Sequence, residues 1–368
     1  MLRPPERGGG DVPRRSLASG RLCLGCAGES DVRWTFQTAE AIVSSPAVAG
    51  GTVYIGSTDN FLYAIDATAG RLRWKFDAHG DVRSSPAVSG NLVYVVSLDG
   101  RLYAVDAATG AEKWNFATQG ERRHTAAGME YAAPSTEVMP DPWDLFLSSP
   151  TVLDGTVYFG SGDGHVYAVD AVTGALRWKF QTGNVVHASP AVAAGLVYVG
   201  SFDTYFYALE AATGRLVWKF KTGDDASAHL MTGIPGSASV ADGIVYFGCR
   251  DAHLYALEAG SGKLRWQYSA GNSWVIASPA ILHGRICFAT SDSLKFVVLD
   301  AKTGVEEFSL PTPPMLSPRP HSPAGRPIMV PLTGNCTRWI WPGRSRPGSL
   351  RRPAPGSTAR ATSTPTAS

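Results

Sequence analysis

Short apolar stretches return along this chain in a fixed order. Between one tryptophan and the next, four pieces recur, and in the first unit they are residues 44–48, 51–57, 61–66 and 72–76. Each is short, and Gly, Asp or Asn residues stand in the turns between them, which is typical of β-strands joined by tight turns. Because no segment keeps a 3.6-residue apolar period, we expect almost no helix.

The tryptophans define the repeat. Successive Trp residues are 40, 40, 64, 40 and 48 positions apart, and Phe308 takes the equivalent place 42 positions after the last. Four strands per unit, repeated at about 40 residues, are typical of β-propeller blades rather than of a sandwich. One blade cannot bury both its faces, so blades must stack. We predict an all-β propeller with six blades readable in frame. The recurring residues are Trp34, Trp74, Trp114, Trp178, Trp218 and Trp266.

Turn residues and ring residues recur with the strands. A tyrosine followed by alanine returns in the first five units, and we expect each large ring to lie over a small neighbour with its N–H or O–H bonded to a backbone acceptor. The first hairpin of a unit needs positive φ at positions such as Gly51, Asn91, Gly155 and Gly243. The second turn carries Gly70, Gly110, Gly174, Gly214, Gly262 and Gly304.

Composition bounds the organisation and the partners. The chain has 368 residues, of which 44% are hydrophobic and 17% charged, with a formal net charge of +2. Residues 311–368 contain eight Arg and no Lys, Asp or Glu, so the rest is mildly acidic and a nucleic-acid partner is not expected. We predict an unstructured segment at 1–30, a propeller at 31–310 and a disordered tail at 311–368. No apolar run is long enough to span a bilayer.

Residues 1–30 and the cysteines add little. The apolar patch at residues 22–27 is shorter than the core of an export signal. Cys23 and Cys26 lack the second pair that would complete a zinc site, and Cys249 and Cys287 stand at different repeat positions. We therefore predict no metal and no disulfide, and interpret the last two as apolar filler.

The strongest motif is Ala64-x-Asp66-x-x-x-Gly70-x-x-x-Trp74. It recurs in the next four units, with Glu replacing Asp in two of them, and the sixth unit has a degenerate copy that ends in Phe308. It resembles the tryptophan-docking motif of pyrroloquinoline-quinone-like (PQQ-like) β-propellers. These include quinoprotein dehydrogenases, the propeller lipoprotein of the outer-membrane β-barrel assembly machinery and sensor domains. The resemblance implies a blade-stacking role for the motif tryptophans, seven or eight blades in an intact ring, and a periplasmic or extracytoplasmic location. The motif tryptophans are Trp74, Trp114, Trp178, Trp218 and Trp266.

A binding face can be predicted from the repeat. In a four-stranded meander, the links between blades and the turns between second and third strands share one face. Two insertions, of about 24 and about 8 residues, fall in such links, so this face is expected to carry function. We predict a protein or a small acidic ligand as its partner. The candidate binding residues are Arg83, His187, Asp224, Asp225, His229 and Trp274.

Each of these candidates has a simpler interpretation. Arg83 and His187 could extend into solvent at the channel mouth. The larger insertion could be a lid or a partner-binding loop. An Asp that recurs in every blade suggests a calcium set, but a residue common to all blades is more typical of turn capping. The recurring residues are Asp59, Asp99, Asp163, Asp203, Asp251 and Asp292.

The sequence favours a non-catalytic scaffold over an enzyme. By resemblance, a quinoprotein dehydrogenase would hold PQQ and calcium, with a catalytic Asp and often adjacent cysteines. This chain has no adjacent cysteines and no unrepeated acidic cluster on an inner strand. We therefore predict no catalytic residues and no cofactor. PQQ-dependent alcohol or sugar oxidation is the alternative.

Back-translation of the tail predicts a changed reading frame. Moving the frame back by one nucleotide forces Gly across Met329 and Val330, Leu across Asn335 and Cys336, and Asp across Trp339 and Ile340. The codons between permit Gly-Ser-x-Asp-Gly-x-Leu-Tyr-Ala-Leu-Asp, which has the spacing of residues 160–170. We infer a further blade in the ancestral protein, and an exposed blade edge in this chain.

Overall fold

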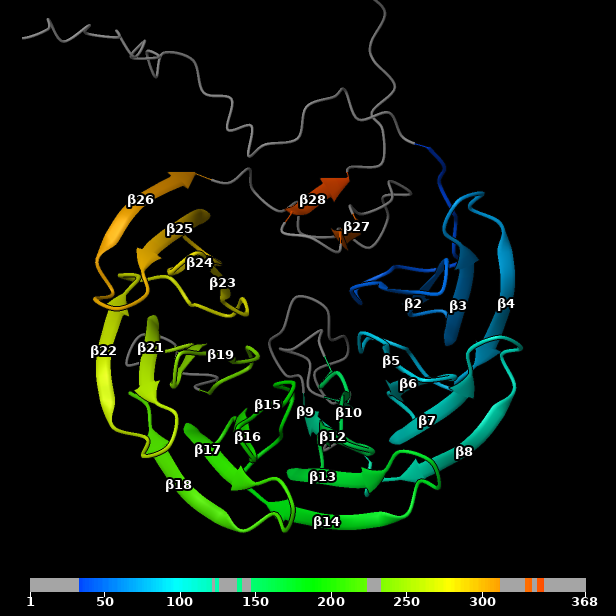
Figure 1. The fold of residues 1–368 in the computed structure, drawn as a ribbon, viewed down its shortest axis with the longest axis horizontal. Coiled ribbons are helices and arrows are strands. Elements are labelled where there is room, and N and C mark those ends of the chain that lie inside the picture. Colours follow the sequence, from blue (N-terminus) through cyan, green and yellow to red (C-terminus); the bar gives the residue numbers. More distant parts are fainter. Residues whose placement is uncertain are drawn as a thin grey trace, which may run out of the picture.

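The computed structural model describes residues 33–120, 147–223 and 233–311, together with the backbone of four short strands at 123–125, 138–140, 328–332 and 336–340. Six four-stranded antiparallel sheets follow one another around a ring, each with its strands in chain order from the inside outwards (Figure 1). No helix occurs in this described part. The predicted all-β propeller with six blades in frame is confirmed.

The strands have the following bounds. The first sheet contains β1 (Ala47–Ala49), β2 (Thr52–Gly56), β3 (Phe61–Asp66) and β4 (Leu72–Asp77), and the second β5 (Ala87–Ser89), β6 (Leu92–Ser97), β7 (Arg101–Asp106) and β8 (Glu112–Ala117). The third contains β11 (Thr151–Leu153), β12 (Thr156–Gly160), β13 (His165–Asp170) and β14 (Leu176–Gln181), and the fourth β15 (Ala191–Ala193), β16 (Leu196–Gly200), β17 (Tyr205–Glu210) and β18 (Leu216–Lys221). The fifth contains β19 (Ser239–Ala241), β20 (Ile244–Gly248), β21 (His253–Glu258) and β22 (Leu264–Ser269), and the sixth β23 (Ala280–Leu282), β24 (Arg285–Ala289), β25 (Lys295–Asp300) and β26 (Glu306–Pro311). Two hairpins pair β9 (Arg123–Thr125) with β10 (Val138–Pro140), and β27 (Ile328–Leu332) with β28 (Cys336–Ile340).

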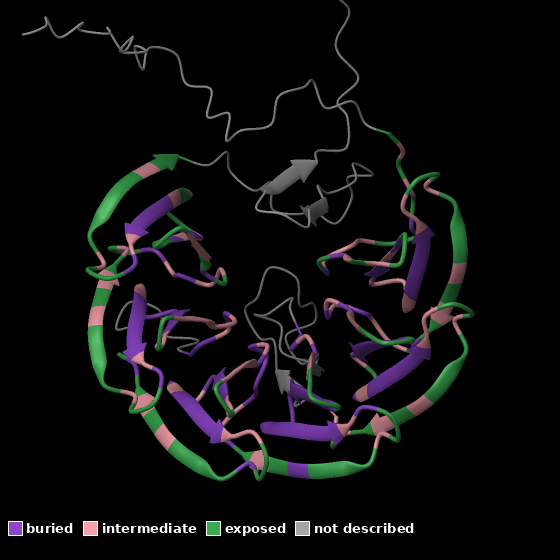
Figure 2. Ribbon diagram, viewed as in Figure 1, coloured by how far each residue is buried: buried purple, intermediate pink, exposed green. Residues whose placement is uncertain are grey.

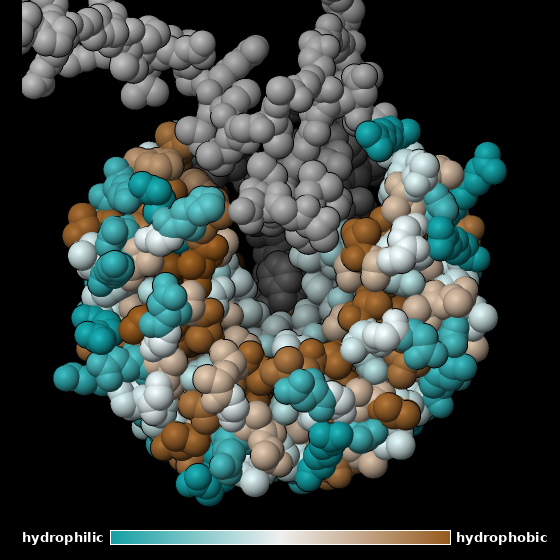
Figure 3. All heavy atoms as spheres, viewed as in Figure 1, coloured by the Kyte–Doolittle hydropathy of each residue, from teal (hydrophilic) through white to brown (hydrophobic). Residues whose placement is uncertain are grey.

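The hydrophobic core lies between the sheets. The third strands are buried on both faces, whereas the outer strands are mostly exposed (Figure 2). Side chains of two successive sheets make up each cluster; for example, Tyr158 and Trp178 pack against Val197 and Leu209 of the next sheet. In Figure 3 hydrophilic side chains gather at the periphery of the ring. Burial therefore requires a neighbouring blade, as the stacking argument predicts.

The motif tryptophans stack the blades. Trp178 lies opposite Ala168 in the pairing of β13 with β14, and the register shifts by one residue directly after that pair. Its Nε1 donates a hydrogen bond to the carbonyl of Ala211 in the next sheet, at 2.9 Å. Its ring lies against Gly214, where an added Cβ would approach it to 2.6 Å. Equivalent bonds are made by Trp74, Trp114, Trp218 and Trp266.

The turns follow the predicted chemistry with one correction. The six second-turn glycines have φ between +67° and +75°. In the first hairpin of the second sheet, positive φ falls on Gly90 (+59°) and not on Asn91, so the prediction for Asn91 was wrong by one position. Glycine can adopt this conformation without a Cβ clash, so it takes the strained position ahead of Asn.

Most of the predicted N-terminal segment and tail lie outside the described residues, so those domain bounds remain predictions. Cys249 and Cys287 are free thiols. Cys249 belongs to the core between the fourth and fifth sheets, where burial raises the pKa of its thiol to about 12. The interpretation of Cys249 as apolar filler is confirmed. None of the described residues forms a helix long and apolar enough to cross a bilayer.

Candidate functional site

The links and the turns between second and third strands share one face, as predicted. Backbone hydrogen bonds connect them in successive blades. The amide of Phe202 donates to the carbonyl of Val185 at 3.0 Å, and the amide of Ser291 donates to that of Trp274 at 3.1 Å. Both insertions, between β8 and β11 and between β18 and β19, fall in links of this face. We call it the link face.

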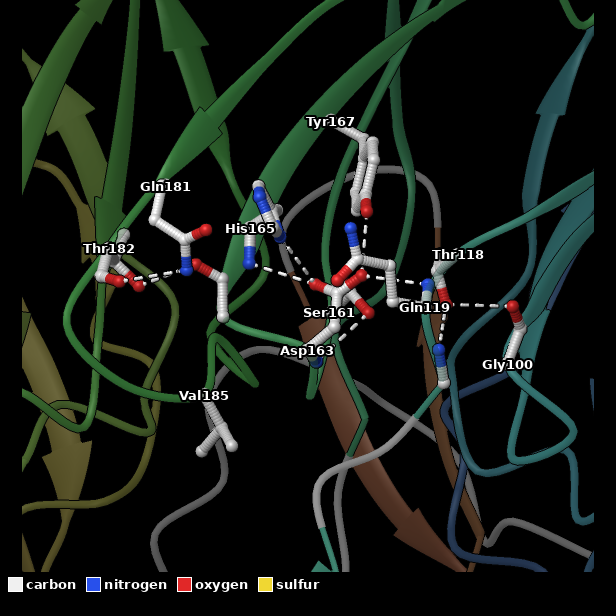
Figure 4. A network of polar contacts seen from close by, with 12 residues as sticks. Gly100, Thr118, Gln119, Ser161, Asp163, His165, Tyr167, Gln181, Thr182 and Val185 are labelled. Carbon is white, nitrogen blue, oxygen red and sulfur yellow. Dashed lines mark hydrogen bonds and ion pairs between the residues drawn. The ribbon is translucent and has the colours of Figure 1, made fainter.

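The recurring aspartates cap the turns of this face. Asp163 Oδ1 accepts a hydrogen bond from the His165 amide at 2.9 Å, and Oδ2 accepts from the Tyr167 hydroxyl at 2.6 Å and from the Gln119 amide at 3.0 Å (Figure 4). Burial, followed by the bond to Asp163, raises the pKa of Tyr167 far above its ordinary value. Asp59, Asp203 and Asp251 make the same set of contacts.

Each of these carboxylates is therefore committed to its own blade and to the link beside it, and the capping interpretation is confirmed for them. Within the described ranges, no group of three or more His, Cys, Asp or Glu side chains could hold a metal ion.

Four side chains break the repeat on the link face. The His187 and Phe202 rings meet edge to face, with centroids 5.6 Å apart. The Arg250 guanidinium carbon lies 4.9 Å from the Phe202 centroid and 5.2 Å from that of Trp274. His187, Phe202 and Arg250 are each only 4% exposed, and Trp274 is half-buried. We call these four residues the cation–aromatic row.

The row extends across three blades. Phe202 follows β16 in the fourth sheet and Arg250 follows β20 in the fifth, while His187 and Trp274 lie in the links before β15 and β23. The backbone of Trp274 is held at two points, because its amide donates to Asp292 Oδ2 at 3.1 Å and its carbonyl accepts from Ser291. A guanidinium between two rings is a cation–π arrangement, which is strengthened when water is excluded.

The structure brings together only some of the predicted site residues. His187 and Trp274 belong to the row. Arg83 forms an ion pair with Asp81 at 2.7 Å and is half-buried, so its side chain is held within its own link. His187 is also buried beneath Phe202 and does not extend into solvent. Asp224, Asp225 and His229 lie outside the described residues, as do the side chains of the 24-residue insertion.

Sequence reasoning missed Phe202 and Arg250. Both occupy the middle of the turn in which Ser or another small residue is followed by a variable residue and then Asp. The signal was present, because this position reads Thr58, Leu98, Gly162, Phe202, Arg250 and Ser291 in successive blades. His187 stands at the link position before a first strand, and a comparison of that position alone leaves this turn out.

The fold and the repeated Trp–Gly contacts define a PQQ-like β-propeller. The profile of the family described as "Outer membrane protein assembly factor BamB" matches residues 27–140, 137–269 and 227–337. This chain belongs to that family. The crystal structure of BamB from Moraxella catarrhalis is similar in fold, with a TM-score of 0.63 and 20% sequence identity over 77% of this chain and 80% of that one. No curated protein matches the chain in sequence.

Proposed function

We propose that this chain is a non-catalytic propeller scaffold that binds a protein partner on its link face, in the assembly of the cell envelope. Membership of a family described as an outer membrane protein assembly factor supports a role in envelope assembly. The cation–aromatic row supports the choice of the link face as the binding surface. This row is the observation that carries the proposal. Its residues differ from those at the equivalent positions of the other blades, so they are not required for blade stacking.

The chemistry of the row favours a protein as the partner. Trp and Arg are the residue types that contribute most of the binding energy in protein interfaces, particularly when they are packed and shielded from water. Trp274 is the half-buried member of the row and has a fixed backbone, so it loses little conformational freedom on binding. Arg83, on the same face, adds a cation that could select an acidic group on that partner.

The test is capture of envelope proteins on the immobilised chain, with the captured proteins identified by mass spectrometry. We expect enrichment of outer-membrane β-barrel assembly proteins. Trp274→Ala should reduce that enrichment by about tenfold or more, since one central interface residue is commonly worth about 2 kcal/mol. The double variant Arg83→Ala, His187→Ala should also reduce it.

Val172→Ala is the matched control, because Val172 is 74% exposed in the turn between β13 and β14, on the opposite face. Equal capture by Trp274→Ala and Val172→Ala would remove the row from the interface. Capture that contains no envelope assembly protein would refute the assembly role.

The non-catalytic half of the proposal has its own check. The purified chain is incubated with PQQ and calcium and tested for dye reduction with alcohols and sugars. We expect no calcium-dependent turnover. Turnover, together with a bound-quinone absorbance, would establish the dehydrogenase alternative instead.

A further inference from the structure

The link between β4 and β5, which leads into the second sheet, carries three polar side chains on one side. Asp81, Arg83 and Ser85 are half-buried, whereas Val82 and Ser84 between them are fully buried. This alternation is typical of an extended segment that has one side against the core. The three half-buried side chains therefore share the other side of the link, and we call them the polar triplet.

Asp81 holds one edge of the Arg83 guanidinium. Nε and Nη2 of Arg83 both donate to Asp81 Oδ2, at 3.0 and 2.7 Å. A guanidinium carries five N–H groups in a planar fork. The edge formed by Nη1 and the second hydrogen of Nη2 donates to no group in the described ranges. The Arg83 side chain is 23% exposed and its Nη1 is open to solvent, so a ligand can reach this second edge.

Arginines that belong to the repeat are bonded differently. Arg73 donates from Nη2 to Asp66 and from Nη1 to Thr52, and Arg177 makes the same two bonds in the third blade. Both terminal nitrogens of these arginines are therefore engaged within the blade. The position of Arg83 reads Val, Leu, His and Ile in four other links. Because the blades do not require a cation there, its open edge indicates a ligand.

Ser85 adds a second donor beside this edge. Its Oγ accepts a hydrogen bond from the Ser45 amide at 2.9 Å, and its own amide donates to Ser149 Oγ at 2.8 Å. The hydroxyl hydrogen of Ser85 is still available, and no described group accepts it. The polar triplet thus offers N–H and O–H donors, while its one carboxylate lies against the opposite edge of Arg83.

This donor set matches a carboxylate. The two oxygens of a carboxylate accept parallel bonds from the guanidinium fork, and such charge-assisted pairs are stronger than neutral hydrogen bonds. The flanking blades place Val43, which is half-buried, and Leu147, which is 7% exposed, at the position of Arg83. Apolar neighbours lower the local dielectric, which strengthens an ion pair that forms beside them.

We propose that the polar triplet is a carboxylate-binding site. The open edge of Arg83 takes both oxygens of the carboxylate, Ser85 donates to one of them, and Asp81 fixes the other edge of Arg83. The carboxylate comes either from an acidic side chain of a bound protein or from a free small acid. This inference rests on the proposed function for its protein partner, and it names the chemistry that the link face recognises.

Titration calorimetry of the full chain with succinate tests the site, with uncharged succinamide as the ligand control. We expect saturable binding of succinate alone. Arg83→Lys should weaken it about tenfold or more, because Lys keeps the charge but cannot form the bidentate pair. Arg73→Lys is the matched control and should bind as the unaltered chain does. Equal succinate affinity of Arg83→Lys and the unaltered chain would overturn the proposal.

The serine has its own control in another blade. Ser85→Ala should weaken succinate binding several-fold. Ser189→Ala removes the equivalent hydroxyl of the fourth blade, which accepts the Ser149 amide at 2.9 Å, and should leave binding unchanged. Equal losses in the two variants would show that Ser85 acts through the structure of the ring and not as a donor to the ligand.

Capture of envelope proteins, repeated with excess succinate, identifies the source of the carboxylate. If a partner supplies it, succinate and Arg83→Lys should each reduce capture, whereas Arg73→Lys should not. If a free acid is the ligand, succinate binds and Arg83→Lys leaves capture unchanged. Succinate binding without capture of any envelope assembly protein would refute the proposed function and leave the site. Absence of succinate binding, with capture that Arg83→Lys does not reduce, would overturn the site itself.

Discussion

The third and sixth blades carry the same fold with different neighbours. In the third, Trp178 is 7% exposed, bonds to Ala211 and lies against the glycine of the next sheet. In the sixth, Phe308 pairs with Val298 in the same register, but is 39% exposed and packs against no following sheet in the described residues. The strand pairing is alike in the two blades, so hydrogen bonding within a blade does not bury its outer ring.

The difference shows where the repeat motif acts. A blade forms its own ladder, whereas the motif tryptophan is buried only by the blade that follows. Stability in such a ring is therefore divided into terms within blades and terms between neighbours. Substitutions at matched positions in the third and sixth blades separate the two.

The largest expected effect is at the third blade. Trp178→Ala should lower the free energy of unfolding by ~3–5 kcal/mol, because a large buried aromatic and its hydrogen bond are lost. Phe308→Ala should cost only about 1–2 kcal/mol, because a ring that is 39% exposed has less burial to lose. Urea unfolding measures both. Equal effects at the two positions would place the stabilisation within blades rather than between them.

A second substitution adds volume at the same interface. Gly214→Ala should be destabilising for two reasons: its φ of +73° is unfavourable with a Cβ, and that Cβ would meet the Trp178 ring at 2.6 Å. Gly243→Ala is the control for backbone conformation alone, because its φ is +74° and nothing lies within 4 Å. We expect ~1–2 kcal/mol for the control and a further ~1–3 kcal/mol for Gly214→Ala from overpacking. If both lose the same amount by urea unfolding, the Trp178 contact adds nothing.

The smallest effect tests a contribution within the blades. The hydrogen bond from Arg73 lowers the pKa of Asp66 to about 2, and bonds from Thr109 lower that of Asp106 to about 2. A carboxylate with a lowered folded-state pKa stabilises the protein above its unfolded pKa of about 4, and this stabilisation is lost as the pH falls towards 2.

Thermal unfolding should therefore give a Tm that changes little from pH 7 to 4 and falls from pH 4 to 2. Asp66→Asn should lower the Tm at pH 7 and weaken its dependence below pH 4. A wild-type Tm that stays constant down to pH 2 would show that these turn carboxylates do not stabilise the fold.

Much of the candidate site followed from the repeat, and the rest required contacts in space. His187 was found because it departs from the pattern of its link position, and Trp274 because it was expected nearby on the same rim. Their connection was not found, because it passes through Phe202 and Arg250, which lie in the turns between the second and third strands of the fourth and fifth blades. Sequence alignment of repeats compares equivalent positions, whereas this row joins positions that are not equivalent. Arg83 was grouped with His187 by that logic, yet it pairs with Asp81 in its own link.

The sequence by itself determined the all-β blades, the order of their strands, the capping aspartates and the residue that stacks each blade. These are local or periodic properties, set by side-chain alternation and turn chemistry, which recur at about 40 residues. Only the tertiary structure decided which ring is buried and which unrepeated side chains meet. Burial and contact depend on the neighbour that the ring places beside each blade, and that neighbour can be distant in sequence.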